Sequence, residues 1–420
     1  MTARAAAAAP LARRRKKRDT ISEMDLPVGA PLRRIAVLGC TGSIGRDALD
    51  LAARHPDRIR VATLACNRDV DGLLAAAKRF RPEAVAAADP WAVAVLANRL
   101  EGSGIRVVSV VDAATWPSAD CTVVGISGVA GLRPSMAAAE AGKRLALANK
   151  ESLVAAGAAL IKLARRSGAE ILPVDSEHAG LFAALQGVQQ GTLRRLWLTA
   201  SGGPLRGASA EDVAAATPER ALRHPTWPGM GRRITVDTAT LLNKGLEVIE
   251  AHHLFDAGAE AIGVVVHPQS VVHAVVELMD GSLLMQASRP DMRLPIAFAL
   301  AYPERWAPPE PAILPTALPD LQFQEPDRAA FPCLDLAYAA LRMGGTAPAV
   351  LNGADEVAVA RFLAGEYSLG QIPRLLEAVL GQHKGGCGEP DLAEALAADA
   401  WARERAAAWR PFPAARGVLR

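Results

Sequence analysis

The sequence predicts an α/β protein with an N-terminal Rossmann-type parallel sheet, a central α+β domain and a C-terminal helical domain. Three observations predict this fold. Short apolar runs alternate with amphipathic segments from residue 34 to residue 174. Strand-like runs joined by a turn at residues 279–281 mark the region 175–301. From residue 330 onward the chain is rich in Ala and Leu at helical spacing.

Apolar runs bounded by turn residues predict the strands of the N-terminal sheet. They cover residues 34–38, 59–65, 84–88, 107–111, 121–124 and 144–147. Helices are predicted between them at residues 43–54, 71–80 and 131–141. The first helix shows the pattern well, since Ile44, Ala48, Leu51 and Ala52 share one face. This βαβ alternation predicts a parallel sheet covered by helices.

The central and C-terminal parts follow a different pattern. The predicted strands of the central domain, 175–301, are residues 195–199, 261–266, 270–278 and 282–287. Prolines are dense between residues 302 and 329, which predicts an ordered linker because few regular elements tolerate them. Residues 330–420 are then expected to form the helical domain.

Length and charge limit the classes of protein that this sequence can encode. The 420 residues suffice for two or three domains with a sizeable core. The formal net charge is only +3, and much of the excess lies in a basic run at residues 13–18, so nucleic-acid binding is not indicated. No apolar stretch is long enough to predict a membrane span. Five scattered cysteines without a CxxC pair indicate a reducing cytoplasm.

Residues 1–33 are excluded from the predicted fold. They are rich in Ala, Arg and Pro, and the alanine run precedes the basic run, which is the wrong order for a secretory signal. We expect a disordered basic extension. An organelle transit peptide is a less favoured alternative, based on the lack of acidic residues before Asp19.

A glycine-rich turn follows the first predicted strand. Gly39, Gly42 and Gly45 place backbone N–H groups at the start of a helix, where they can meet a pyrophosphate. At the end of the second strand, Arg68 provides a cation suited to an adenosine 2′-phosphate, although Asp69 beside it weakens that argument. These features predict a dinucleotide site that favours NADPH and assign residues 34–174 to cofactor binding.

Two carboxylate motifs predict a metal site. Asp175 and Glu177 are two residues apart and would point to the same side of an extended segment. A second stretch brings Asn243, Lys244 and Glu247 together. Hard oxygen ligands beside amide and ammonium donors suit Mg²⁺ or Mn²⁺ and a phosphorylated substrate. The residues therefore indicate a metal-dependent reductase that acts on a sugar phosphate.

Several longer motifs resemble the 1-deoxy-D-xylulose 5-phosphate reductoisomerase family. They are ANKES at 148–152, PVDSEH at 173–178, TASGGP at 199–204, HPTW at 224–227, DTATLLNKGLE at 237–247 and LNGADEVA at 351–358. The resemblance extends in order from about residue 34 to the C-terminal region. It implies the conversion of 1-deoxy-D-xylulose 5-phosphate and NADPH to 2-C-methyl-D-erythritol 4-phosphate, in non-mevalonate isoprenoid biosynthesis. It also implies a homodimer in the bacterial cytoplasm.

The resemblance implies roles for individual residues. Asp175, Glu177 and Glu247 would hold Mg²⁺ or Mn²⁺, with Co²⁺ as a further candidate, and Lys150 would be catalytic beside them. The substrate would also contact Ser176, Ser201, His224, Trp227, Thr238, Asn243 and Lys244. The cofactor would contact Thr41, Gly42, Ser43, Ile44, Asn67, Arg68, Asn149, Glu151 and Gly231.

Three positions depart from the family pattern. Thr238 stands where a serine is expected, Cys40 replaces a commoner serine in the glycine turn, and the lid around Trp227 is one residue longer. None of them removes an expected metal ligand. The other histidines of the region, at 178, 252, 253, 267 and 273, are interpreted as packing or surface residues.

Two other functions compete with this interpretation. Another Rossmann oxidoreductase, such as a semialdehyde dehydrogenase, would need a catalytic cysteine or a different acid–base set, and no cysteine in the sequence has a matching histidine context. A catalytically silent NADP sensor would be favoured by loss of Lys150 or of a carboxylate, and all of these are present.

Overall fold

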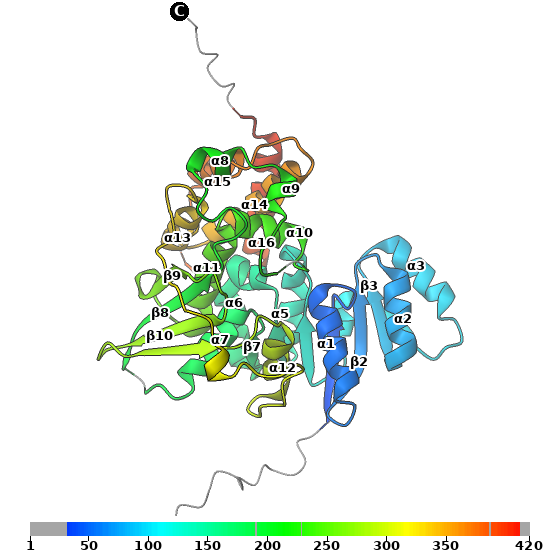
Figure 1. Ribbon diagram of the computed structural model, residues 1–420. Helices are drawn as coiled ribbons and strands as arrows, with labels where there is room; N and C mark the ends of the chain where they lie inside the picture. Colours follow the sequence, from blue (N-terminus) through cyan, green and yellow to red (C-terminus); the bar gives the residue numbers. More distant parts are fainter. Residues whose placement is uncertain (1–31, 190, 228, 386–387, 412–420) are drawn as a thin grey trace, which may run out of the picture.

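The computed structural model describes residues 32–411 except 190, 228 and 386–387. The predicted basic extension therefore lies outside the described residues up to residue 31. Figure 1 shows a lobe at the right that carries the first strands and helices, a body at the left with the second sheet, and the C-terminal helices above that body. This arrangement agrees with the predicted fold class.

A parallel sheet of seven strands forms the core of the N-terminal part in the described chain. Its order is β4-β3-β2-β1-β5-β6-β7, and every neighbouring pair is parallel. The strands are β1 (Arg33–Leu38), β2 (Ile59–Cys66), β3 (Ala84–Ala87), β4 (Arg106–Val108), β5 (Cys121–Val124), β6 (Arg144–Leu147) and β7 (Ile171–Pro173). The carboxyl ends of β1, β6 and β7 lie at the same edge, where side chains from distant parts of the chain can meet.

Helices cover both faces of this sheet, as β-α-β crossovers require. They are α1 (Ser43–Arg54), α2 (Val70–Phe80), α3 (Pro90–Arg99), α4 (Val110–Ala114), α5 (Leu132–Glu140) and α6 (Lys150–Ser167). Leu73 of α2 and Leu96 of α3 are fully buried against the sheet side of these helices. Further along the chain, α12 (Arg293–Ala301) packs on α1, and its Ile296 and Leu300 belong to the same apolar core.

The second sheet has four strands within the described residues, in the order β11-β10-β8-β9. It consists of β8 (Leu193–Ala200), β9 (Ile262–Val266), β10 (Val272–Leu278) and β11 (Leu283–Ala287). The β8–β9 pair is parallel, and the other two pairs are antiparallel. The helices before and between these strands are α7 (Ser176–Leu185), α8 (Ala210–Ala214), α9 (Pro218–Ala221), α10 (Arg232–Ala239) and α11 (Leu242–Phe255).

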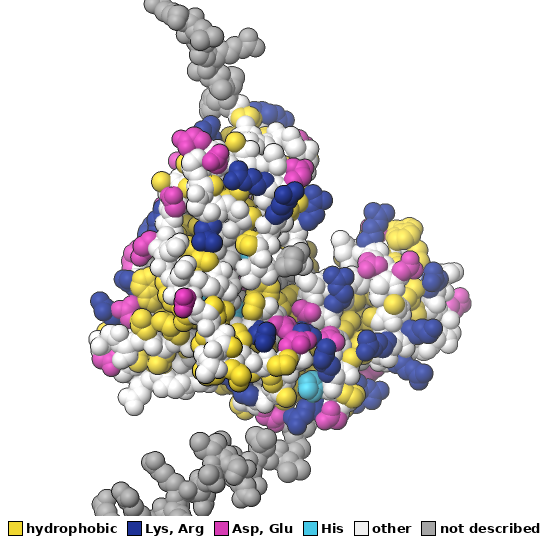
Figure 2. All heavy atoms as spheres, viewed as in Figure 1, with side chains coloured by type: hydrophobic (Ala, Val, Ile, Leu, Met, Phe, Trp, Pro, Cys, Tyr) yellow, Lys and Arg dark blue, Asp and Glu magenta, His cyan; other side chains and the backbone are white. Residues whose placement is uncertain are grey.

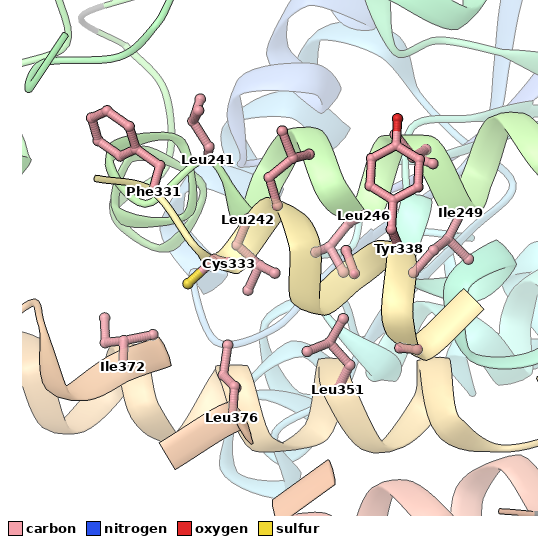
Figure 3. Packing of buried hydrophobic residues seen from close by; sticks show 14 of the residues in the cluster. Leu241, Leu242, Leu246, Ile249, Phe331, Cys333, Tyr338, Leu351, Ile372 and Leu376 are labelled. Carbon is pink, nitrogen blue, oxygen red and sulfur yellow. The ribbon is translucent and has the colours of Figure 1, made fainter. Parts of the chain in front are cut away.

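Four C-terminal helices complete the described fold: α13 (Cys333–Met343), α14 (Ala347–Leu363), α15 (Gln371–Gln382) and α16 (Leu392–Ala408). Of these helices, α13 packs on α11, and α14 and α15 pack on α13. Figure 3 shows the shared apolar cluster, with Leu246 and Ile249 of α11, Tyr338 of α13, Leu351 of α14 and Leu376 of α15. These side chains are almost entirely removed from water, which strongly stabilises the packed helices. The helix that carries the second carboxylate motif is therefore held rigidly from one side.

One local prediction needs correction. Residues 107–111 were expected to be one strand, but β4 ends at Val108 and a helix begins at Val110. The Ser109 hydroxyl accepts a hydrogen bond from the Asp112 amide at 3.0 Å, so it caps the helix and ends the extended segment. The proline-rich segment has little regular structure, but Gln324 pairs with Val266 of β9 and ties the segment to the second sheet.

Candidate active site

Lys150 occupies the first helical position of α6, directly beyond β6. Asn149 is the N-cap residue, and its Oδ1 accepts a hydrogen bond from the Ser152 amide at 3.0 Å. This cap satisfies one of the free N–H groups at the helix start and fixes the direction of the next side chain. As a result the Lys150 side chain lies buried at the carboxyl edge of the sheet.

Asp175 and Glu177 lie at the start of α7, after β7. Asp175 is the N-cap residue and Glu177 belongs to the first turn. The expectation that both project from an extended segment was therefore wrong, because the helix begins at Ser176. The two carboxylates nevertheless converge, since residues at the start of a helix point back toward the strand that precedes it.

The third carboxylate comes from α11. Glu247 lies four positions after Asn243 and three after Lys244, so it shares one side of this helix with both. Asn243 Nδ2 donates to Glu247 Oε1 at 2.6 Å. Since α13 packs against the opposite side of α11, this face is presented toward α6 and α7 as one rigid unit.

The three carboxylates and two ammonium groups form one cluster. The carboxylates of Asp175, Glu177 and Glu247 have oxygens that all lie within 4.8 Å of one another. Lys150 Nζ is 2.6 Å from Asp175 Oδ2 and 3.0 Å from Glu247 Oε1. Lys244 Nζ is 2.9 Å from Glu177 Oε1 and also contacts Glu247. Fully ionised, the five groups carry one net negative charge, which a divalent cation would turn positive.

Burial and neighbouring charges compete in this cluster. Burial disfavours the charge of Lys150, but the carboxylates of Asp175 and Glu247 outweigh it and raise the Lys150 pKa well above its ordinary value. For Asp175, burial is likewise outweighed, and Lys150 holds its pKa well below the usual range. Burial raises the pKa of Glu177 to about 7, because Lys244 offsets only part of it. A bound divalent cation would keep this carboxylate ionised.

A second trio lies behind the first and shares Asp175. His178 Nδ1 is 3.5 Å from Asp175 Oδ1 and 3.6 Å from Glu250 Oε2, and the ligand atoms of all three lie within 4.8 Å of one another. Burial disfavours charge on His178, but Glu250 and then Asp175 raise its pKa to about 9. His178 was interpreted as a packing or surface residue. The structure instead places it, fully buried, between two carboxylates.

Ser201 and His224 form a separate polar pair beyond β8. The Nδ1 atom of His224 accepts backbone hydrogen bonds from Thr226 at 3.1 Å and from Trp227 at 2.9 Å. The proton of the neutral ring must then be on Nε2, which lies 3.1 Å from the Ser201 hydroxyl. Burial lowers the pKa of His224, which agrees with a neutral ring.

The Ser201 hydroxyl accepts two hydrogen bonds, from His224 Nε2 and from the Gly203 amide at 3.1 Å. Its own hydrogen is therefore directed away from both donors and can be given to a ligand. Thr238 behaves differently, because its hydroxyl donates to the Ile234 carbonyl of its own helix at 2.8 Å. The threonine hydroxyl would have to rotate before it could donate to a phosphate.

Sequence profiles of one enzyme family match most of the chain. The profile described as 1-deoxy-D-xylulose 5-phosphate reductoisomerase matches residues 35–157, and that of the C-terminal domain of the same enzyme matches residues 171–255. A third profile, described as the DXP reductoisomerase C-terminal domain, matches residues 287–405.

Curated relatives agree along the same length. The 1-deoxy-D-xylulose 5-phosphate reductoisomerase of Cyanothece sp. is 46% identical over 381 residues, which cover 89% of this chain and 98% of the relative. That of Moorella thermoacetica is 48% identical over 380 residues, covering 90% and 98%. The chain belongs to the 1-deoxy-D-xylulose 5-phosphate reductoisomerase family.

Solved reductoisomerase structures are similar in fold as well as in sequence. A DOX-P reductoisomerase in complex with NADPH, fosmidomycin and magnesium is 40% identical, with a TM-score of 0.86 over 90% of this chain and 98% of the other. The Zymomonas mobilis reductoisomerase in complex with NADPH is 42% identical, with a TM-score of 0.83 over 90% and 99%. The predicted fold class is thereby confirmed.

The glycine turn lies between β1 and α1. Gly39 has φ +80°, and a Cβ there would approach the Gly125 carbonyl oxygen to 2.5 Å. A Cβ on Gly45 would lie 2.2 Å from the Gly39 carbonyl oxygen. Gly42 is the N-cap residue of α1 and offers no side-chain cap. The backbone N–H groups at this helix start are thus available to an anion.

The remaining predicted cofactor residues divide into two groups. Asn67 and Arg68 are exposed beyond β2, and Gly231 is exposed just before α10. Asn149 and Glu151 are buried, and their polar groups are used within the protein. Asn149 Nδ2 donates to the carbonyls of Ile126 and Gly128, at 2.8 and 2.9 Å. Glu151 accepts from the Gly128 amide at 2.9 Å.

Sequence reasoning missed a buried ionic network around Arg233. This guanidinium lies 2.9 Å from Glu151 Oε1, 3.0 Å from Glu356 Oε1 and 3.2 Å from Asp355 Oδ2. It joins the start of α10 to α6 and α14, next to the predicted lid. The only local signal is the i,i+4 spacing of Arg233 and Asp237, which are 3.5 Å apart. Glu250 was also missed, although it lies one turn after Glu247.

Proposed function

We infer that this chain is a 1-deoxy-D-xylulose 5-phosphate reductoisomerase of non-mevalonate isoprenoid biosynthesis. It converts 1-deoxy-D-xylulose 5-phosphate to 2-C-methyl-D-erythritol 4-phosphate and depends on NADPH and a divalent metal. The observation that carries the proposed site is the convergence of carboxylates from α7 and α11 with Lys150 of α6 and Lys244 of α11 in one buried cluster. Relatives of the same name cover almost the whole chain.

The donor set of the first carboxylate trio fits Mg²⁺ or Mn²⁺, since all three ligands are hard oxygens. Asp175, Glu177 and Glu247 would hold the metal. When bound, it would polarise the neighbouring oxygens of the substrate and stabilise negative charge that develops on them. The second trio is a poorer candidate, because it is almost fully buried and includes an imidazole that Glu250 already pairs with.

Lys150 is proposed to work on the reacting oxygens of the substrate. Its high pKa keeps it charged, so it acts as an electrostatic group and as a hydrogen-bond donor at the position where oxyanion charge forms. Asn243 Oδ1 accepts from Lys150 Nζ at 2.9 Å and holds the ammonium in this direction. Ser176, whose hydroxyl donates to Glu177 at 2.5 Å, is proposed to contact the substrate beside them.

The phosphate is proposed to bind between β8, α10 and α11. Ser201 would donate its free hydroxyl hydrogen, Lys244 would supply charge, and Asn243 would supply an amide. Thr238 would join them after rotation away from Ile234. His224, held neutral by the two backbone amides, would position Ser201, and Trp227 would cover the carbon backbone and exclude water.

NADPH is proposed to bind across the carboxyl edge of the parallel sheet, where it would supply the hydride. Its pyrophosphate would lie against Thr41, Gly42, Ser43 and Ile44 at the start of α1. Asn67 and Arg68 would contact the adenosine end. Asn149 and Glu151 would act near the nicotinamide, mainly by shaping the loop at residues 126–129 through the bonds that they make to it. Gly231 would approach the cofactor at the end of the lid.

The domain division stays a proposal. Residues 34–174 would form the NADPH-binding domain, 175–301 the catalytic domain with the metal and substrate, 302–329 the linker and 330–420 the helical domain. Many contacts cross these boundaries; among them, α12 packs on α1 and Gln324 pairs with β9.

We also propose a homodimer, paired through the edge of the second sheet. β11 is the edge strand, and Leu283, Leu284 and Met285 on it are exposed, as is Met279 before the turn. A long apolar edge of this kind is an open site for strand pairing. A second copy would cover it. Light scattering of Leu284→Lys against wild type tests this, and an unchanged dimer mass would contradict pairing at this edge.

A cytoplasmic location is proposed from the cysteines. Cys40, Cys66, Cys121 and Cys333 are free and buried in the described chain, as a reducing compartment allows. No helix among the described residues is long and apolar enough to cross a membrane.

The direct test of the proposed function is NADPH oxidation by the purified protein with 1-deoxy-D-xylulose 5-phosphate. We expect turnover with Mg²⁺ or Mn²⁺ and none after removal of divalent metal by a chelator. Product analysis should give 2-C-methyl-D-erythritol 4-phosphate. Metal-independent oxidation of NADPH, or a different product, would contradict the proposal.

A further inference from the structure

Trp91 is an exposed aromatic residue at the start of α3. Its side chain is 57% exposed. Figure 2 shows the lobe that carries α2 and α3 projecting at the right, with many Lys and Arg side chains on its surface. Tryptophan side chains are largely buried in most folded proteins, so an exposed indole is unusual. Exposed apolar surface can mark the place where a ligand or partner binds.

The strand order places Trp91 beside Arg68. β2 and β3 are parallel neighbours, and the loops that follow them continue the pairing. The Ala88 amide donates to the Cys66 carbonyl, and the Asp89 amide donates to the Asn67 carbonyl, each at 3.1 Å. The start of α3 is thus fixed against the loop at residues 67–68, where the cofactor's adenosine end is proposed to bind.

Asp89 fixes the orientation of the first turn of α3. Its Oδ1 accepts hydrogen bonds from the Trp91 amide at 2.9 Å and from the Ala92 amide at 3.2 Å. Pro90 takes the first helical position, where its restricted φ suits a helix start. The indole is therefore presented by a rigid helix start and not by a loose loop.

Arg68 lies against the indole but is weakly held. Its guanidinium carbon is 5.6 Å from the centroid of the Trp91 ring. Its Nε is 3.7 Å from Asp89 Oδ2, and its side chain is 71% exposed. Two planar groups, one aromatic and one cationic, therefore stand side by side at the carboxyl end of β2 and β3, with their outer surfaces open to a ligand.

The direction of the sheet indicates which ligand part reaches them. The pyrophosphate turn follows β1, and the sheet continues from β1 to β2 and β3 on one side and to β5 and β6 on the other. Lys150 follows β6, so the reacting end of the cofactor must extend toward β6. The adenosine end must then extend toward β2 and β3, where Arg68 and Trp91 lie.

We propose that Trp91 is the platform on which the adenine of the cofactor stacks, while Arg68 beside it binds the 2′-phosphate. The inference rests on the proposed function for the identity of the cofactor and adds a residue to its binding site. Stacking of a base on an indole uses the exposed ring face, and the 2′-phosphate pairs with the adjacent guanidinium. Trp91 then serves any adenine dinucleotide, and Arg68 distinguishes NADPH from NADH.

The test separates these two contributions by calorimetric titration with NADPH, NADH and 2′,5′-ADP. Trp91→Ala should weaken the binding of all three nucleotides to a similar degree, raising each Kd by roughly ten-fold or more. Arg68→Ala should weaken the binding of NADPH and 2′,5′-ADP and leave the binding of NADH nearly unchanged. Trp91→Phe should recover most of the affinity, since a phenyl ring also stacks. Trp401→Ala, which removes a tryptophan from α16, serves as the control and should bind as wild type.

Two results would overturn the inference. The first is that Trp91→Ala binds the three nucleotides with wild-type affinity. The second is that Trp91→Phe binds them as weakly as Trp91→Ala does, while both variants have the melting temperature of wild type. Binding of 2′,5′-ADP does not depend on the sugar phosphate. If wild type fails to oxidise NADPH with that substrate but Trp91→Ala still weakens 2′,5′-ADP, the proposed function fails and the adenine platform stands.

Discussion

Asp355 offers a quantitative test of the buried network around Arg233. Its Oδ1 and that of Asp237 are both buried without a hydrogen-bond partner among the described residues. Burial raises the Asp355 pKa to about 6, with Arg233 opposing the shift, and burial together with Asp355 raises the Asp237 pKa well above its ordinary value. The pair therefore retains a proton at a pH where exposed aspartates have lost theirs.

The sign of the pH dependence follows from this shift. Between the ordinary pKa near 3.9 and the folded value, the folded protein binds more protons than the unfolded chain, so its stability falls as pH rises. A shift of about two units corresponds to about 3 kcal/mol lost between pH 4 and pH 7. Asp355→Asn removes this loss and provides an amide that can donate to Asp237. The variant should be more stable than wild type at pH 8, by up to about 3 kcal/mol.

The assay is the melting temperature by calorimetry from pH 4.5 to pH 8, with each variant compared to wild type at the same pH. The difference between Asp355→Asn and wild type should grow with pH and level off above about pH 7. Asp57→Asn, at an exposed aspartate, is the matched control and should show no such trend. A variant that is less stable than wild type by the same amount at every pH would refute the reasoning.

Two further predictions concern the ligands. Thr238→Ser should change the KM for the sugar phosphate little. Thr238→Val keeps the shape of the side chain but removes the hydroxyl, so it should weaken binding of the sugar phosphate by about 1–3 kcal/mol. Steady-state kinetics check this, and equal KM values for the two variants would exclude a contact between Thr238 and the phosphate. Ser201→Ala should raise the same KM because it removes a hydroxyl hydrogen that is free to be donated to a ligand. The KM for NADPH should not rise with it, and a parallel rise would point to loss of folding or of lid position.

Sequence patterns were a better guide to which residues to consider for the candidate site than to the backbone conformation around them. On α11, Asn243, Lys244 and Glu247 could be grouped because Glu247 lies four and three positions after the other two, which places it on their side of the helix whatever the rest of the fold. The setting of Asp175 and Glu177 could not be read correctly, since PVDSEH fits either an extended segment or a helix start. Only the packing of α7 beside β10 and α12 decides between them.

Other features depend on contacts that no local pattern encodes. Arg233 meets Glu151 and Asp355 from positions 82 and 122 residues away in the chain, so its role appears only once α6, α10 and α14 are packed together. His178 looks like an ordinary helix residue until Glu250 is brought beside it. The parallel sheet, in contrast, was predictable, because its strands are short apolar runs with turn residues at both ends.

The central claim is that Asp175, Glu177 and Glu247 hold the divalent metal, and Mn²⁺ binding measured by electron paramagnetic resonance tests it most directly. Wild type should bind one ion per chain, and Glu247→Gln should lose that binding without loss of NADPH affinity. Glu250→Gln is the matched control, because Glu250 belongs to the second trio, which shares Asp175. The account predicts that Glu250→Gln still binds Mn²⁺. Retained binding in Glu247→Gln with loss in Glu250→Gln would contradict it and move the metal to Asp175, His178 and Glu250.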